Sequence, residues 1–231
     1  MDMPFSLEIS LGSQKAVRRI LTRRLPGGFT LVEMLVVLTI IIALSALVVP
    51  AASSVVRGSS ITYAVQSVSA QFTLARQTAI ARNRTVELRL YKSFDPNNPG
   101  ADAANSDAWR FRAFQLFQNA PDGTAAPLSK VERLPNQVIV DSGATLSTLV
   151  NDTTRTLQTG STTSLPGVGT SYKYCSVRFR SDGSTDLDPT KQWFLTIHSL
   201  QDGDAMSKPP TNFVTLQIDP VQGGITIFRP L

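Results

Sequence analysis

The chain has 231 residues, of which 42% are hydrophobic and 17% are charged, and this composition excludes a disordered protein. Its net charge of +5 is uneven, because residues 1–28 hold five basic and two acidic side chains while the remainder holds 17 basic and 15 acidic ones. That near balance makes the sequence pI of about 9.7 weak evidence for nucleic-acid binding, and a single cysteine, Cys175, excludes an internal disulfide.

Residues 1–28 have the features of a leader that is removed. Their basic side chains precede an apolar segment, which predicts a cytoplasmic N-terminus and an exported C-terminus. Pro26-Gly27-Gly28 then breaks any helix and leaves an extended segment that a protease can bind.

Residues 29–50 form an apolar segment with one charge, Glu33. As a helix the segment is about 33 Å long, enough to cross a bilayer core of about 30 Å. A carboxylate in such a helix costs roughly 2.5–3.5 kcal/mol at mid-bilayer and less near the interface. The charge therefore requires a partner.

Three interpretations of this N-terminus stand at this point. An ordinary secretory signal would be cut after the apolar segment, within Val49–Ser53, although the segment is longer than such signals usually are. The pairs Arg18-Arg19 and Arg23-Arg24 suggest twin-arginine export, but membrane topology explains them more simply. In a prepilin signal the cut comes before the apolar segment, which is retained.

The combination of a basic leader, Gly28-Phe29, Glu33 and an unbroken apolar helix resembles the N-terminus of type IV pilins and pseudopilins. The resemblance implies that a prepilin peptidase cuts between Gly28 and Phe29 and that the new amine of Phe29 is methylated. It also implies that Glu33 is an assembly contact, which neutralises the Phe29 amine of a neighbouring subunit when the helices pack. Paired charges in a low-dielectric bundle are tolerable where a lone charge is not.

The helix is predicted to continue through residues 51–84 as its soluble half. Ile61, Val65, Val68, Phe72, Ala75 and Ala79 recur at spacings of three and four, which places them on one helical face. Residues 70–90 resemble the junction between the helix and the first strand of H-type minor pseudopilins. Residues 74–79, 86–87 and 141–146 resemble a narrower group of prepilin-type proteins called Verru_Chthon cassette protein D.

Residues 85–231 are predicted to form a β-rich globular domain with exposed loops at 93–108 and 141–171. Val86 to Leu90 alternates apolar and polar side chains, as a half-buried strand does. Leu146, Leu149 and Val150 are expected to dock a short turn of the second loop. Further strands are predicted at 109–118, 128–134, 137–140, 176–181, 193–200, 213–218 and 225–228. The fold class is α+β and pilin-like: a long N-terminal helix packed on a mostly antiparallel sheet.

No constellation in the sequence indicates an enzyme, a metal site or a cofactor. His198, the only histidine, is interpreted as a surface or core-edge residue, and Cys175 has no histidine nearby in sequence. Major pseudopilins hold calcium in a C-terminal loop, but the aspartates around Gly183 and Gly203 do not have EF-hand spacing and suit turns.

The sequence therefore favours a minor pseudopilin-like subunit of an envelope filament, in a type II secretion or type IV pilus-like system. Its partners would be the prepilin peptidase, other pilin or pseudopilin subunits and the inner membrane, with the globular domain outside the cytoplasm. One alternative is a DNA-binding minor pilin with a basic surface at Arg82, Arg84 and Arg89. Another is a membrane-anchored or secreted binding module.

Overall fold

The computed structural model describes residues 28–95, 104–160 and 164–229, and for residues 47–54 it describes the helical backbone without the side chains. The predicted leader, apart from Gly28, and the middle of the predicted loop 93–108 lie outside these residues. The chain divides into two compact units, one up to Leu47 and the other from Val48 onward.

One helix, α1, runs from Leu31 to Arg82 and belongs to both units. It ends where the sequence predicts, because Asn83 adopts a left-handed conformation with φ of 50°. The backbone N–H groups of Asn83 and Arg84 donate to the carbonyls of Ile80 (3.2 Å) and Ala79 (3.1 Å). This is a Schellman motif, which satisfies the last carbonyls of the helix and turns the chain toward the first strand.

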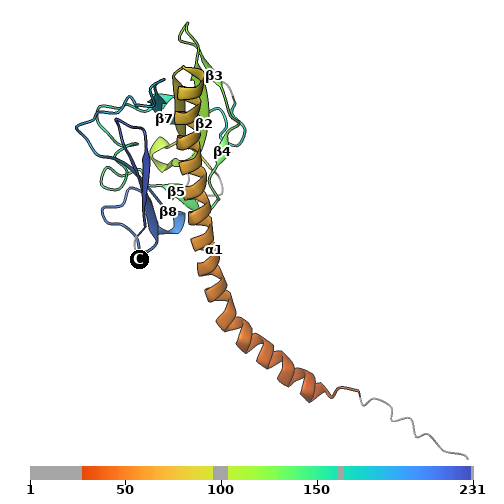
Figure 1. Cartoon of the computed structure of the whole chain (residues 1–231). Coiled ribbons are helices and arrows are strands. Elements are labelled where there is room, and N and C mark those ends of the chain that lie inside the picture. Colours follow the sequence, from red (N-terminus) through yellow and green to blue (C-terminus); the bar gives the residue numbers. More distant parts are fainter. Residues whose placement is uncertain (1–27, 96–103, 161–163, 230–231) are drawn as a thin grey trace, which may run out of the picture. The chain divides into compact units, whose positions relative to one another are not determined.

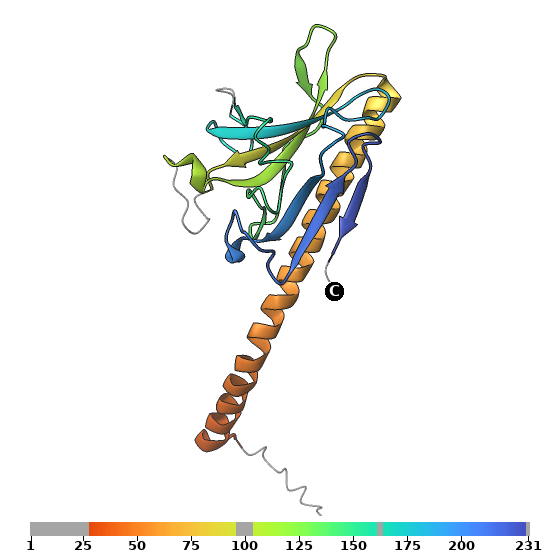
Figure 2. The same cartoon turned by 90° about the vertical axis from the view of Figure 1, so that its left-hand side faces the viewer.

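The globular unit is built on the predicted apolar face of α1. Ile61, Val68, Phe72, Ala75 and Ala79 are all buried and belong to one core cluster with residues of the sheet. Figures 1 and 2 show this half of the helix lying along the sheet. The helical spacing of the apolar residues is therefore the physical basis of the packing.

The remaining elements form a single ten-stranded sheet in which every pairing between strands is antiparallel. Its main order is β10-β9-β8-β5-β2-β1-β7-β6, and β3 and β4 pair with β2. The strands are β1 (Val86–Ser93), β2 (Arg110–Asn119), β3 (Ala125–Pro127), β4 (Glu132–Arg133), β5 (Val138–Val140), β6 (Gln158–Thr159), β7 (Tyr172–Phe179), β8 (Trp193–Ser199), β9 (Phe213–Ile218) and β10 (Ile225–Phe228). Two short 3₁₀ helices, η1 (Ser106–Ala108) and η2 (Leu200–Asp202), lie in the connections. The predicted α+β fold is confirmed.

The prediction that β1 is half-buried is wrong. Its polar-face residues Glu87 and Tyr91 are as buried as its apolar residues. A second, smaller cluster covers this face of the sheet, and it includes Tyr91, Tyr172 and Val168. Val168 comes from the predicted loop 141–171, so a distant part of the chain buries a face that the local alternation assigns to solvent.

The described residues of the segment 141–171 include the short strand β6, and they are anchored to the core at several points. Leu146, Leu149 and Val150 are buried, which confirms that they dock onto the core. The strand β7 begins at Tyr172, four residues earlier than the sequence indicates, because Tyr172 and Cys175 face apolar neighbours on opposite sides of the sheet.

His198 is not a surface or core-edge residue, and that prediction is wrong. It has no exposed area, and its Nε2 lies 3.1 Å from Oδ2 of Asp141 while its Nδ1 lies 2.9 Å from the Ser199 carbonyl oxygen. Both partners are acceptors, so both ring nitrogens carry protons and the pair is an imidazolium and a carboxylate. Asp141 also accepts from the backbone N–H groups of Gly143 and Met206, and so ties three segments together.

The pKa values of this pair follow from the same contacts. Burial alone lowers the pKa of His198, but the bonds to Asp141 and Ser199, with Asp202 nearby, outweigh it and the net shift is upward. Burial raises the pKa of Asp141, but the bonds from His198 and the backbone outweigh it and the net shift is downward. The folded state therefore favours the charged form of both groups.

The first prediction concerns the helix–sheet interface. Phe72 is fully buried and meets Phe179 edge to face, with ring centroids 6.2 Å apart. We expect Phe72→Ala to lower the free energy of unfolding by about 3–5 kcal/mol. Urea unfolding followed by the fluorescence of the buried Trp193 measures it. Leu74→Ala, at an exposed site on the same helix, is the control and should change stability by about 0.5 kcal/mol or less; equal effects would contradict the proposed interface.

The second prediction concerns the His198–Asp141 pair. Since the folded-state pKa of His198 is raised, its contribution is complete below the unfolded pKa of about 6.5 and is lost as pH rises through the folded value. His198→Gln should cost roughly 3–5 kcal/mol at pH 6, because it leaves Asp141 buried without its cation. The difference from the unsubstituted protein should shrink toward pH 9 in urea titrations. A difference that is constant from pH 6 to pH 9 would show that the imidazolium is not the stabilising form.

Candidate processing and assembly site at the N-terminus

The bond between Gly28 and Phe29 lies just before α1 in exposed, irregular backbone. Gly28, Phe29 and Thr30 are all exposed, and the Phe29 side chain is 77% accessible. Among the described residues beyond its chain neighbours, no atom lies within 4 Å of the place where a Cβ on Gly28 would be. The predicted processing site is thus accessible to a protease, while cleavage and methylation stay predictions.

Thr30 and Glu33 form a capping box at the start of α1. The Glu33 backbone N–H donates to Oγ1 of Thr30 at 3.1 Å, and the Thr30 backbone N–H donates to Oε2 of Glu33 at 3.5 Å. The first intrahelical bond runs from Met34 N–H to the Thr30 carbonyl. The spacing Thr-x-x-Glu is the sequence pattern of this motif. Its spacing is present in the sequence, but the motif was not predicted, because only the cost of the Glu33 charge was considered.

The capping box gives Glu33 a role within its own chain. Its carboxylate lies in the first turn, where the helix macrodipole favours a negative charge, and it satisfies one of the N–H groups left free at a helix start. A carboxylate has about four lone-pair sites, and this contact uses one of them. Glu33 can therefore cap its helix and still accept a second donor from elsewhere.

The helix that follows is apolar on every side. Each side chain from Leu31 to Ala46 is exposed, and the large apolar ones are Leu31, Val32, Met34, Leu35, Val36, Val37, Leu38, Ile40, Ile41, Ile42 and Leu44. The hydroxyl of Thr39 donates to the Val36 carbonyl at 2.8 Å, so this polar group is satisfied inside the helix. Among the residues that the structure describes, no helical stretch combines the length and the apolarity needed to cross a membrane.

The three arginines of the candidate basic surface lie in different surroundings. Arg82 and Arg84 are exposed at the end of α1, where Arg82 donates to Oε1 of Gln118 at 2.7 Å. Arg89 lies in β1, bonded to Glu87 at 2.9 Å and stacked 3.9 Å from the centre of the Phe117 ring. Its charge is compensated within the domain, so the three do not present one basic surface.

The aspartates and the cysteine that could in principle bind a metal ion or act as a nucleophile have structural roles. Asp182 and Asp188 accept from Ser184 and Thr190 two residues later, which is the turn geometry expected for aspartate. In the described part of the chain, no three histidine, cysteine or acidic side chains gather closely enough to hold a metal ion. Burial raises the pKa of the Cys175 thiol to about 11, so it is protonated at neutral pH.

Comparisons with solved structures give two distant likenesses. The minor pseudopilin EpsH of the type 2 secretion system of Vibrio cholerae aligns with a TM-score of 0.40 and 11% identity, over 74% of this chain and 97% of EpsH. The type IV minor pilin FimU of Pseudomonas aeruginosa aligns with a TM-score of 0.39 and 12% identity, over 74% of this chain and 92% of FimU. Neither likeness establishes a shared function.

A sequence comparison with curated proteins gives no match. A family model does match: the prokaryotic N-terminal methylation motif aligns with residues 23–49. That span contains the exposed Gly28–Phe29 bond, the capping box and the apolar first part of α1. This chain therefore carries a prokaryotic N-terminal methylation motif, which includes the first part of α1.

Proposed function

We propose that the chain is a minor pseudopilin-like structural subunit of an envelope filament, of the type II secretion or type IV pilus kind. The observation that carries the proposal is the methylation motif at residues 23–49, because it coincides with the start of the helix that also forms the core of the globular unit. The work of such a subunit is non-covalent assembly, without catalysis.

Processing is the first step of the proposed function. A prepilin peptidase cuts the exposed Gly28–Phe29 bond, and the new Phe29 amine is methylated. The basic residues of the leader hold the N-terminus in the cytoplasm until then. The apolar start of α1 lies in the inner membrane as a single-pass anchor, since a helix apolar on every side needs an apolar environment on every side. The globular unit lies on the other side of the membrane.

Assembly is the second step, and Glu33 has a specific part in it. When subunits leave the bilayer and pack through the apolar starts of their helices, the Phe29 amine of one subunit meets Glu33 of its neighbour. Pairing neutralises both charges in the low-dielectric bundle. Glu33 is suited to this contact because its capping bond to Thr30 fixes its position and leaves lone pairs for the incoming amine.

The third prediction separates the two roles of Glu33. Glu33→Gln keeps an oxygen that can cap Thr30 but removes the charge, whereas Glu33→Ala removes both. We expect both variants to be processed and to reach the membrane, and both to enter filaments about tenfold less than the unsubstituted chain, because the neighbouring amine loses its partner. Immunoblots of sheared filaments against whole cells measure incorporation.

Thr30→Ala is the matched control for this experiment. It removes the hydroxyl that caps the helix and leaves the charge, so it should enter filaments nearly as well as the unsubstituted chain. If Glu33→Gln enters filaments normally and Thr30→Ala does not, Glu33 acts through capping, and the proposed pairing between subunits is wrong.

A further inference from the structure

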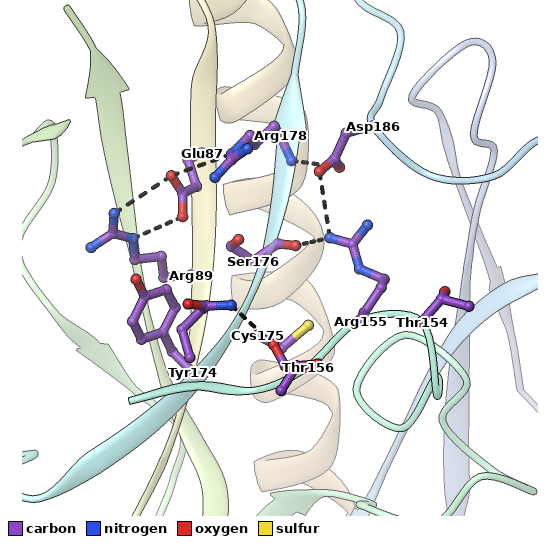
Figure 3. Close-up of a pocket in the computed structure, with 11 residues that line it drawn as sticks. Glu87, Arg89, Thr154, Arg155, Thr156, Tyr174, Cys175, Ser176, Arg178 and Asp186 are labelled. Carbon is purple, nitrogen blue, oxygen red and sulfur yellow. Dashed lines mark hydrogen bonds and ion pairs between the residues drawn. The ribbon is translucent and has the colours of Figure 1, made fainter. Parts of the chain in front are cut away.

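A polar cleft of about 390 Å³ lies in the globular unit, beside β7. The short strand β6 pairs with β7 only at Tyr174 and Lys173. Beyond that pairing, residues 154–156 form the opposite wall, and the cleft lies between them and the side chains of β1 and β7 (Figure 3).

The charged groups in this cleft form an alternating chain. Arg89 Nε lies 2.9 Å from Glu87 Oε1, and Glu87 Oε2 lies 3.7 Å from Arg178 Nε. Asp186 then accepts from the Arg178 backbone N–H at 2.9 Å, and its other oxygen lies 3.6 Å from Arg155 Nη2. Figure 3 shows the five side chains around the cleft. The chain has a guanidinium at each end.

The charge of the cleft is therefore positive by one unit. Three arginines face two carboxylates, and Cys175, which also lines the cleft, is neutral because burial raises its pKa to about 11. The uncharged walls are polar as well, with Thr154, Thr156 and Gln158 among them. A polar ligand with a single negative charge would neutralise the cleft, whereas a phosphate dianion would leave it negative.

Arg178 is the arginine best placed to bind such a ligand. The Arg178 side chain is 54% exposed, and at 3.7 Å its contact with Glu87 is too long for a hydrogen bond, so its donors can turn to a ligand at little cost. Arg155 uses the same terminal nitrogen for the Ser176 carbonyl and for Asp186, while its buried Nε has no hydrogen-bond partner among the described residues. Arg155 also lies 5.8 Å from the centre of the Trp193 ring. Both it and Arg89, which is held by Glu87 and by the rings of Phe117 and Tyr174, are fixed in the wall of the cleft.

We propose that this cleft is a carboxylate-binding site, in which Arg178 holds the carboxylate through the planar fork of its guanidinium and Arg155 adds positive charge in the wall of the cleft. Guanidinium and carboxylate match in shape and form paired hydrogen bonds. The carboxylate belongs either to an acidic side chain of a polypeptide or to a small free acid. The site is a property of the folded globular unit and does not depend on the proposed assembly function.

The fourth prediction tests the site by NMR titration of the full chain in detergent micelles at fixed ionic strength. The probes are acetate, the peptides acetyl-Gly-Glu-Gly-amide and acetyl-Gly-Gln-Gly-amide, and inorganic phosphate. We expect the glutamyl peptide to give saturable shifts at the amides of residues 154–158 and 174–178, and the glutaminyl peptide to give none. Saturation by acetate as tight as by the peptide would identify a free acid as the source; weaker saturation would identify a polypeptide.

Variants give the test its controls. Arg178→Gln, at a half-exposed side chain, should fold normally and weaken glutamyl-peptide binding by about tenfold or more. Arg178→Lys keeps the charge without the fork and should give an intermediate affinity. Arg84→Gln, an exposed arginine outside the cleft, should bind as the unsubstituted chain does. The proposal is overturned if the two peptides give equal shifts, if no probe saturates, if phosphate binds more tightly than the glutamyl peptide, or if Arg178→Gln binds normally.

Discussion

The packing of one apolar face of α1 against the antiparallel sheet determines how the globular unit is arranged. Phe72, Ala75 and Ala79 of that face lie in the same core as Phe179 and Leu216, which are far away in sequence. The Schellman motif at Asn83 then starts β1, which pairs with β2 on one side and β7 on the other. The element that carries the methylation motif is thus also the element on which the sheet folds. The globular unit therefore depends on the second half of α1, beyond the residues that match the motif.

Much of this arrangement could be predicted from the sequence, because its strongest patterns are local. The three- and four-residue spacing from Ile61 to Ala79 specifies the buried helix face, and the short apolar runs specify β8, β9 and β10. The failures arise where distant segments meet. Tyr91 is buried in a cluster with Val168 and Tyr172, and His198 is buried because Asp141 supplies a charge partner. The residues next to Tyr91 and His198 in the sequence show no pattern that would predict either contact.

The candidate site at the N-terminus illustrates a different limit. Gly28, Phe29 and Glu33 could be predicted as site residues from the sequence. The prediction gave the Glu33 carboxylate no partner in its own chain. The structure gives it one in Thr30, three residues earlier. Capping lowers the cost of carrying the carboxylate at the start of an apolar helix, and it leaves lone pairs free for the contact between subunits that we propose. In the globular unit, the polar cleft beside β7 could not be foreseen, because its charged residues come from β1, β7 and two loops.

The proposed assembly function depends most on where the mature chain begins, because it requires the apolar start of the helix to be retained. Intact-mass measurement of the protein, purified from the membranes of a host that produces a prepilin peptidase, determines this directly. The account predicts a chain that starts at Phe29 and is one methyl group heavier than the unmodified residues 29–231. A chain that starts near Ser53, or one that keeps residues 1–28 in the presence of the peptidase, would contradict it.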